Sequence, residues 1–377
     1  MKNFMKTAAL TMAVLSIGFT SCKKIPKTID ELSDHGFDVK LFKDNLVKAY
    51  DGKTVGYSFA IGKVGQVVLP TAGGKARLAL DGEADYTTDT RLGIGSTSKT
   101  ITALAIMKGL KKNGLDETAK IKDFLPTGWK LPDVNQGIRF KDVLAHSAGL
   151  QNFGGDYAAL KKMVETPTTG IGNRAYDNAN YTLCRLLVAY LVGNRNDIED
   201  DADPNYTTCD IYRSYVRTEI FKPAGLAKWD KIDIGPWSEN VAAGDDKMTL
   251  YYDYSTPTLK GTTRYTTLLE AGPGGWYMNP TEVTQVMVAA EGGKLIPTDM
   301  MSRMKELLLG FDGIEAGEHG NYTWKNGVWN DAQNRGIYTI IMHFPNNVQV
   351  VWHTNSRQTN IGDCETAIRK AYDASWR

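Results

Sequence analysis

Similar hydrophobic patterns occur at both ends of the chain. Apolar residues recur at helical spacing over 39–50, and 364–376 also has the pattern of a helix. Between these helices lie two pairs of β-rich runs, and a turn rich in glycine, proline or asparagine separates the members of each pair. The runs are 55–61, 66–69, 336–344 and 348–354. We therefore expect the two chain ends to pack together in one α/β domain.

Helical patterns dominate the middle of the chain, from about residue 98 to residue 267. The predicted helices are 99–112, 140–146, 157–165, 180–192 and 208–220. The simplest assembly is an α/β domain made of 37–97 and 268–377, with a mostly helical domain, 98–267, inserted between its two parts. A chain of 377 residues with 42% hydrophobic content can fill a core of that size.

The start of the chain has the pattern of an export signal. Two lysines precede an apolar run, 8–19, that is too short to span a bilayer. The run leads into Cys22 in a context that resembles the cleavage site of bacterial lipoproteins. We predict a signal peptide over 1–21, a lipid on Cys22 and a tether over 22–36; an ordinary signal peptide with an incidental cysteine is the alternative. The lipid would be the only attachment to a membrane, on the periplasmic side of a bacterial membrane or at the cell surface.

The remaining composition argues against several classes of partner. Lys and Arg number 44 against 43 Asp and Glu, so no basic excess favours nucleic acid. The five histidines are scattered and no glycine-rich phosphate loop follows a predicted strand, so we expect neither a metal nor an organic cofactor. Cys184 and Cys209 either form a disulfide or are buried thiols, and the apolar surroundings of Cys184 favour the thiol.

A serine and a lysine at the start of the first middle helix have the spacing of a catalytic pair. A serine hydroxyl becomes a nucleophile only when a nearby base takes its proton. Ser96 and Lys99 are one helical turn apart, so their side chains point to the same face. The helix N-terminus also offers N–H groups to a developing oxyanion. Because this motif is short, a plain N-cap role for Ser96 is the alternative.

The second motif is Tyr176-Asp177-Asn178, just before another predicted helix. A tyrosine with a lowered pKa next to a lysine ammonium can act as a general base, and an asparagine amide can hold a substrate carbonyl and the lysine. The alternative for Tyr176 is a half-buried aromatic residue with a solvated hydroxyl.

The third motif is Lys325-Asn326-Gly327, which enters the predicted C-terminal sheet. A lysine on a strand can attract a substrate carboxylate, and a glycine beside it lets the backbone approach the acyl group. An exposed turn lysine is the alternative. Each motif has copies elsewhere in the chain, so their order along the chain is more informative than any one of them.

That order resembles a known superfamily. The segments 91–100 and 143–150 are similar to those around the nucleophile of class C β-lactamase and D,D-peptidase-like serine hydrolases. The resemblance extends from about Phe37 to the C-terminus, and with its predicted anchor the chain resembles a penicillin-binding-protein-like lipoprotein. It implies a β-lactamase/transpeptidase-like α/β fold, with an antiparallel sheet flanked by helices and an inserted, mostly helical domain.

The resemblance also implies catalytic roles. Ser96 would be acylated, and Lys99 and Tyr176 would share the proton transfers. The backbone N–H groups of Ser96 and Val328 would form the oxyanion hole. His146 would be structural, since the chemistry of this family needs no histidine base.

The implied substrate-binding residues depart from the family in one place. Asn178 would orient the substrate, and Lys325, Asn326 and Gly327 would bind it, with the lysine at its carboxylate end. The family usually carries Thr or Ser where this chain has Asn326. The missing hydroxyl disfavours efficient β-lactam hydrolysis, while the lysine favours an anionic, peptide-like substrate.

Two hypotheses follow. The first is a serine hydrolase that forms an acyl-enzyme and acts on D-amino-acid peptides, cell-wall fragments, β-lactams or related esters and amides, with D,D-carboxypeptidase or esterase activity favoured over efficient β-lactamase activity. The second is a non-catalytic receptor lipoprotein that binds peptidoglycan or β-lactams. Ser96, Lys99 and Tyr176 favour the enzyme, because a receptor needs no activated nucleophile.

Overall fold

The structure is a computed structural model that describes residues 36–377 except 194, 236–248, 257, 265–267 and 358–363. The predicted signal peptide, the predicted lipidation site Cys22 and the predicted tether up to residue 35 lie outside the described residues. In the described part of the chain, no helix combines the length and apolar character needed to cross a membrane.

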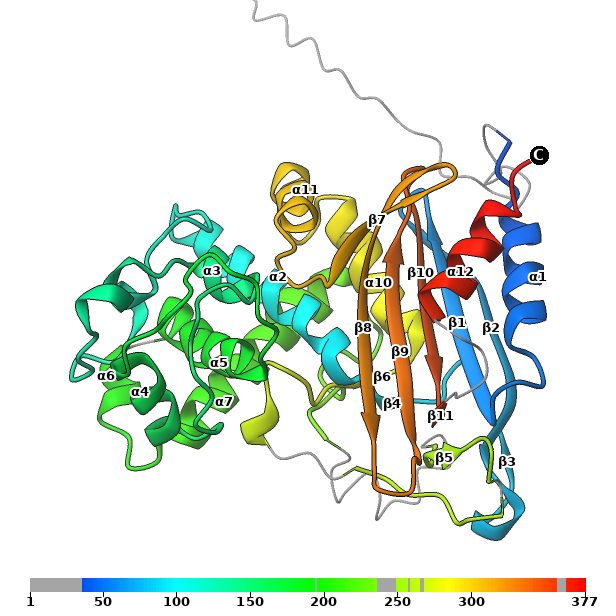
Figure 1. The fold of residues 1–377 in the computed structure, drawn as a ribbon, viewed down its shortest axis with the longest axis horizontal. Coiled ribbons are helices and arrows are strands. Elements are labelled where there is room, and N and C mark those ends of the chain that lie inside the picture. The colour runs from blue at the N-terminus through cyan, green and yellow to red at the C-terminus, as the bar shows by residue number, and fades with distance from the viewer. Residues whose placement is uncertain (1–35, 194, 236–248, 257, 265–267, 358–363) are drawn as a thin grey trace, which may run out of the picture.

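One large sheet is assembled from both chain ends and stands beside a mostly helical part (Figure 1). Its strands lie in the order β7, β8, β9, β10, β1, β2, β3, and each neighbouring pair is antiparallel. The bounds are β1 Gly56–Lys63, β2 Gln66–Arg77, β3 Ala84–Asp85, β7 Gly313–Gly317, β8 Gly320–Asn330, β9 Gly336–His343 and β10 Val348–Thr354. The four predicted β-rich runs therefore correspond to β1, β2, β9 and β10.

Short strands extend the sheet and connect it to the rest of the chain. β5 (Tyr252–Asp253) pairs antiparallel with β9 and parallel with β11 (Ser356–Arg357). β4 (Leu92–Gly93) and β6 (Tyr277–Met278) form a separate two-stranded ladder. β5 lies within the range 98–267 that was predicted as the helical domain, so the chain returns to the sheet before residue 268.

The outer face of the sheet is covered by the first and last helices, α1 (Val39–Tyr50) and α12 (Cys364–Asp373), which contact each other (Figure 1). The buried residues of α1 recur at helical spacing and include Phe42 and Tyr50. The Tyr50 ring stacks on Trp352 of β10, with 4.3 Å between ring centroids. These residues belong to one of the two hydrophobic clusters found among the described residues.

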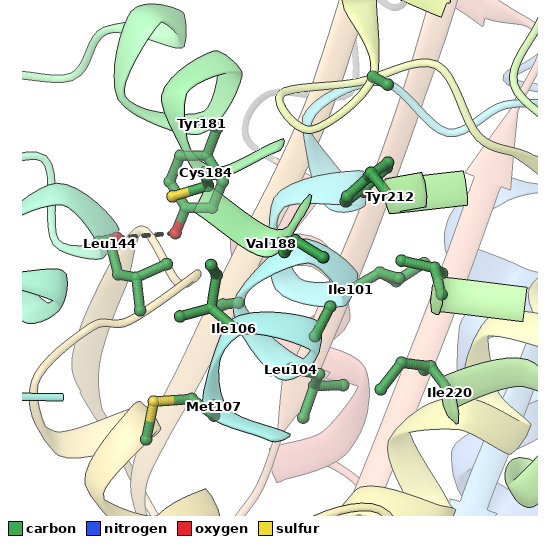
Figure 2. Close-up of a cluster of buried hydrophobic side chains, with 14 of the residues drawn as sticks. Ile101, Leu104, Ile106, Met107, Leu144, Tyr181, Cys184, Val188, Tyr212 and Ile220 are labelled. Atoms are coloured by element: carbon green, nitrogen blue, oxygen red, sulfur yellow. Dashed lines mark hydrogen bonds between the residues drawn. The ribbon is translucent and has the colours of Figure 1, made fainter. Parts of the chain in front are cut away.

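The inner face packs on α10 and on the turn that precedes α2, and the second hydrophobic cluster continues from it into the helical part. α2 lies within this cluster, and Figure 2 shows side chains of α5, α7 and the turn before α8 arranged around it. A buried hydrogen bond from the Tyr181 hydroxyl to Leu144 O, 2.7 Å, ties α5 to the end of α3 (Figure 2). The helices are α2 Ser98–Lys112, α3 Phe140–Leu144, α4 Tyr157–Glu165, α5 Asn178–Val192, α6 Arg195–Glu199, α7 Pro204–Tyr215, α8 Lys222–Ala224, α10 Pro280–Glu291 and α11 Thr298–Glu306.

Candidate active site

Ser96 lies in a tight turn that leads directly into α2. A 3₁₀ turn over Gly95–Thr97 precedes the helix, and Lys99 is in its first turn. Lys99 Nζ is 2.9 Å from Ser96 Oγ, as the spacing predicted. The free N–H groups and partial positive charge of a helix N-terminus are therefore next to the serine.

A second helix N-terminus brings Tyr176 and Asn178 to the same place. Asp177 caps α5, and its carboxylate accepts a hydrogen bond from Ala179 N at 2.8 Å. The Tyr176 hydroxyl donates to Ser96 Oγ at 2.8 Å, and Asn178 Oδ1 is 2.7 Å from Lys99 Nζ. Residues about eighty positions apart thus form one hydrogen-bonded group around the Ser96 hydroxyl.

The surroundings of Lys99 lower the pKa of its amine. Besides Ser96 Oγ, the Lys99 Nζ atom contacts Asn178 Oδ1 and Pro273 O, the latter at 2.8 Å. All three partners are uncharged oxygens, so none of them compensates a charge on the amine. Lys99 is fully buried, and burial lowers its pKa well below that of a solvated lysine; the charge of Lys325 lowers this pKa further. A lowered pKa and the contact with Ser96 Oγ suit Lys99 to the predicted role of base for Ser96.

Tyr176 has the opposite protonation behaviour from the one predicted. Tyr176 is 50% exposed, but desolvation of the part that lies in the site raises the pKa of Tyr176 to about 12, and the hydrogen bond with Ser96 opposes this rise. The prediction of a lowered tyrosine pKa is therefore wrong, because desolvation outweighs the nearby cations. A neutral phenol that donates to Ser96 Oγ can give a proton to a leaving group and recover it from Lys99.

His146 supports the tyrosine from the protein side. Its ring packs against Tyr176, with 4.5 Å between ring centroids, and its Nδ1 accepts a hydrogen bond from Asp177 N at 3.3 Å. Burial is the main cause that lowers the pKa of His146 to about 3, and neighbouring positive charge, such as that of Lys325, adds to this effect. The ring is neutral at ordinary pH and positions Tyr176.

Lys325 is placed in the interior and not in the open cleft. Its side chain on β8 is 1% exposed, and its Nζ is 2.8 Å from both carboxylate oxygens of Asp312. The same Nζ is 5.0 Å from the centre of the Tyr176 ring. The Lys325 ammonium is already paired with the Asp312 carboxylate, which argues against direct contact between Lys325 and a substrate carboxylate.

Asn326 faces the other side of the sheet, so the prediction that its side chain contacts substrate is wrong. Alternate residues of a strand point to opposite faces. Lys325 pairs with Ile341 and Asn326 with Ile340, and these isoleucines belong to different hydrophobic clusters. The Asn326 amide donates to Tyr338 Oη at 3.3 Å and to Glu365 Oε1 at 3.1 Å.

Gly327 and Val328 bring β8 against the nucleophile. A Cβ atom on Gly327 would lie 2.4 Å from Ile94 O and 2.8 Å from Ser96 N, so only glycine allows this approach. Val328 follows with an exposed side chain and lines the same cleft as Ser96. Val328 therefore lies beside the serine turn, and its part in an oxyanion hole stays a prediction.

The cleft beside Ser96 has a volume of about 420 Å³ and is lined by loops, α5 and the end of β8. Among the lining residues that the structure describes, Arg264 and Glu270 are the charged ones. Lining residues other than these two are Gly95, Ser96, Asn152, Gly154, Gly155, Asn178, Thr182, Leu269, Pro273, Gly274, Val328 and Trp329.

Several functional positions had no signal in the sequence. Asp312, Pro273, Arg264 and Glu270 belong to no motif, and only tertiary contacts reveal them. The structure also answers the question on the cysteines: Cys184 and Cys209 are buried thiols and are not joined in a disulfide. Over the described ranges, no three His, Cys, Asp or Glu side chains come together as metal ligands.

Comparison with solved structures identifies the fold. A β-lactamase/D-alanine carboxypeptidase from Yersinia pestis has a TM-score of 0.65 and 17% identity, over 88% of this chain and 98% of that one. A D-alanine carboxypeptidase from Burkholderia cenocepacia has a TM-score of 0.65 and 14% identity, over 89% and 99%. A D-amino acid amidase from Ochrobactrum anthropi has a TM-score of 0.61 and 15% identity, over 89% and 98%. The fold is β-lactamase/transpeptidase-like, as the motifs implied.

No curated protein sequence is a significant match to the chain. The family model for β-lactamase matches residues 38–372, which is nearly all of the part that the structure describes. Together with the fold and the group of side chains around Ser96, this match shows that the chain belongs to the β-lactamase family of serine hydrolases.

Proposed function

We propose that this protein hydrolyses ester or amide bonds in D-amino-acid peptides and related compounds, through an acyl-enzyme on Ser96. The observation that carries the proposal is the arrangement of Lys99 Nζ and the Tyr176 hydroxyl, 2.9 Å and 2.8 Å from Ser96 Oγ. A buried lysine with a lowered pKa costs stability and has no use in a receptor, but it is the kind of base that a serine nucleophile requires.

In the first half of the reaction, Ser96 Oγ attacks the carbonyl carbon while the Lys99 amine takes its proton. The carbonyl oxygen becomes an oxyanion held by the N–H groups of Ser96 and Val328. The bond to the leaving group then breaks, and the leaving atom receives a proton from the Tyr176 hydroxyl. Lys99 returns its proton to Tyr176 through a water molecule, which leaves an ester on Ser96 and neutral Lys99 and Tyr176.

In the second half, water takes the place of the leaving group. It gives a proton to the same Lys99 and Tyr176 pair and attacks the ester carbonyl. The bond to Ser96 Oγ breaks, Oγ recovers the proton, and the acid product leaves. The net reaction consumes one water and restores each side chain.

The substrate preference follows from the wall formed by β8. Asn326 offers no hydroxyl in the cleft and Lys325 is paired with Asp312, so the groups that would hold a β-lactam carboxylate are absent or occupied. We propose esterase or D,D-carboxypeptidase activity rather than efficient β-lactam hydrolysis, with the terminal carboxylate of a peptide held by another group of the cleft. The relatives in fold that are described as a D-alanine carboxypeptidase and a D-amino acid amidase support this preference.

Intact-protein mass spectrometry tests the proposal against the receptor alternative. After incubation with a fluorophosphonate or a fluorescent penicillin, an adduct on the wild type that is lost in Ser96→Ala supports the enzyme. Ser98→Ala is the matched control, because Ser98 is buried two residues away and removing its hydroxyl leaves the base untouched. Ligand binding without an adduct from any electrophile would support the receptor.

A substrate panel then separates the enzyme activities. We expect Ser96-dependent turnover of D-Ala-D-Ala peptides or p-nitrophenyl esters, and slow turnover of nitrocefin. Nitrocefin as the fastest substrate would overturn the preference. We also propose that the protein is exported and anchored by a lipid on Cys22, which labelling with a radioactive fatty acid and a Cys22→Ser variant would test.

A further inference from the structure

A single ion pair carries the charge on the wall of the Ser96 cleft, as far as the described residues show. Arg264 Nη2 is 2.5 Å from Glu270 Oε2, and the two side chains are 37% and 35% exposed. Both therefore form part of the cleft surface and remain accessible to a ligand in it.

The backbone on either side of this pair is held in place. The Tyr277 hydroxyl donates to Arg264 O at 2.9 Å, and the Arg264 guanidinium lies over the Trp329 ring at 5.8 Å. Gly274 N donates to Glu270 O at 3.3 Å. The cation and the carboxylate are thus presented from two fixed points on the cleft wall.

A buried arginine braces the wall from behind. Arg185 of α5 is fully buried, and its guanidinium donates to Leu269 O at 2.6 Å and to Gly155 O at 2.8 Å. Leu269 and Gly155 both line the cleft. One side chain therefore fixes the turn that carries Glu270 to the opposite loop, which is the construction expected of a binding wall.

Lys325 is not placed to bind a charged group of the substrate, because its side chain is 1% exposed and paired with Asp312. The contact between the Arg264 and Glu270 side chains uses Arg264 Nη2 and Glu270 Oε2, and both side chains are about one-third exposed. A substrate carboxylate can therefore bind the other N–H groups of the guanidinium, and a substrate ammonium can bind the other carboxylate oxygen. A ligand that carries both charges uses both groups at once, so the pair favours a zwitterion over either single charge.

We propose that Arg264 and Glu270 recognise a zwitterionic amino-acid head group on the substrate, with the carboxylate on Arg264 and the ammonium on Glu270. This inference rests on the proposed hydrolase activity and specifies its substrate class. The group that reacts with Ser96 is then a separate ester or amide carbonyl in the same molecule. The substrate is an acyl compound whose far end is a free amino acid.

Matched thioesters test the proposal. Four compounds share one aryl thiol leaving group and an acyl chain of equal length, and the chain ends in an amino-acid group, a carboxylate, an ammonium or a methyl group. Each set is made at two chain lengths, both long enough to prevent cyclisation. We expect kcat/KM for the zwitterionic compound to exceed that of each other compound by about tenfold or more at one length.

Variants assign this preference to the ion pair. Within each variant the preference is a ratio of kcat/KM values, so a change in overall activity cancels. We expect Arg264→Gln to remove the advantage that the carboxylate gives, and Glu270→Gln to remove the advantage that the ammonium gives. The reversed pair, Arg264→Glu with Glu270→Arg, should recover part of the preference for the zwitterion, which a purely structural role would not produce.

Arg195→Gln is the control, because Arg195 pairs with Glu199 at 3.2 Å and is 38% exposed outside the cleft. Equal kcat/KM for the four compounds, a preference for a single charge, or a preference that survives both Gln variants would overturn the inference. The methyl-ended thioester distinguishes failure of this inference from failure of the proposed hydrolase function. If it is hydrolysed in a Ser96-dependent manner, the proposed function stands, and if no thioester is hydrolysed, the proposed function itself fails.

Discussion

Two buried lysines close to the Tyr176 ring have contrasting surroundings. Lys99 Nζ and Lys325 Nζ lie 5.1 Å and 5.0 Å from the centre of this ring, and both side chains are almost completely buried. Lys99 is surrounded by a hydroxyl, an amide oxygen and a carbonyl oxygen, whereas Lys325 contacts both oxygens of the Asp312 carboxylate.

This difference shows how one protein uses the same side chain in two ways. Burial lowers the pKa of both lysines, but the Asp312 carboxylate opposes this effect directly at Lys325. Lys325 keeps its charge, and this charge helps to keep Lys99 neutral. We interpret Lys325 and Asp312 as a fixed electrostatic element behind the base, and not as a carboxylate receptor.

Removing the base has the largest expected effect. Lys99→Met keeps an unbranched chain of similar length but takes away the amine, so acylation by a fluorophosphonate should slow by about 10³-fold or more. Stopped-flow labelling would measure the rate, and circular dichroism would check the fold. A rate within tenfold of the wild type would show that Lys99 is not the base. Lys99→Arg should be equally slow, since guanidinium stays charged.

Breaking the ion pair at Lys325 should mainly affect stability. Asp312→Asn leaves a buried ammonium without its carboxylate, and removing one partner of a buried pair costs about 3 kcal/mol or more. Urea denaturation would measure this loss. The double variant Lys325→Met with Asp312→Leu removes both charges and should recover much of it. If Asp312→Asn were as stable as the wild type, the pair would not hold a charge.

Protonation of His146 has a smaller expected effect, which is a loss of folding stability in acid. Its pKa is about 3 in the folded protein and about 6.5 in an unfolded chain, so the folded state binds fewer protons between these values. Its contribution to stability is complete above pH 6.5 and is lost as the pH falls toward 3. From pH 7 to pH 5 we expect this loss to be about 1 to 2 kcal/mol.

The control for this effect is His146→Asn, which keeps a hydrogen-bond acceptor and suits the left-handed backbone at this position, φ 57°. The variant should lose less stability between pH 7 and pH 5 than the wild type does, as judged from urea denaturation at each pH. An equal loss in both proteins would mean that another group dominates the acid transition.

The sequence was informative wherever the structure depends on local spacing. Ser96 and Lys99 meet because they are one helical turn apart, and the predicted helices 39–50 and 157–165 have the observed bounds because their apolar periodicity is regular. The order of motifs also identified Tyr176 and Asn178, which reach Ser96 from a separate helix N-terminus.

The rest depends on tertiary contacts that leave no local pattern. Lys325 was expected to face substrate because its partner Asp312, thirteen residues earlier, belongs to no motif and pairs with it only in the folded protein. Asn326 faces the side of the sheet opposite to Lys325, because strand register decides which face a side chain takes. The pKa of Tyr176 rises through burial, which spacing alone does not predict.

The most sensitive test of the comparison is a pair of opposite shifts in the pH profile. The neutral form of Lys99 is the active one, so kcat/KM should rise with pH as Lys99 loses its proton, with a midpoint below the usual lysine value. The charge of Lys325 lowers the pKa of Lys99 and the charge of Asp312 raises it. Lys325→Met should therefore move the rising limb to higher pH, and Asp312→Asn should move it to lower pH.

Two controls support this test of the pH profile. A neutral ester as substrate keeps the profile free of substrate ionisation. The Arg195→Gln variant should leave the rising limb in place, because the Arg195 ion pair lies outside the cleft. Shifts in the same direction in both variants would mean that unfolding or repacking, and not the field of this ion pair, sets the protonation of Lys99.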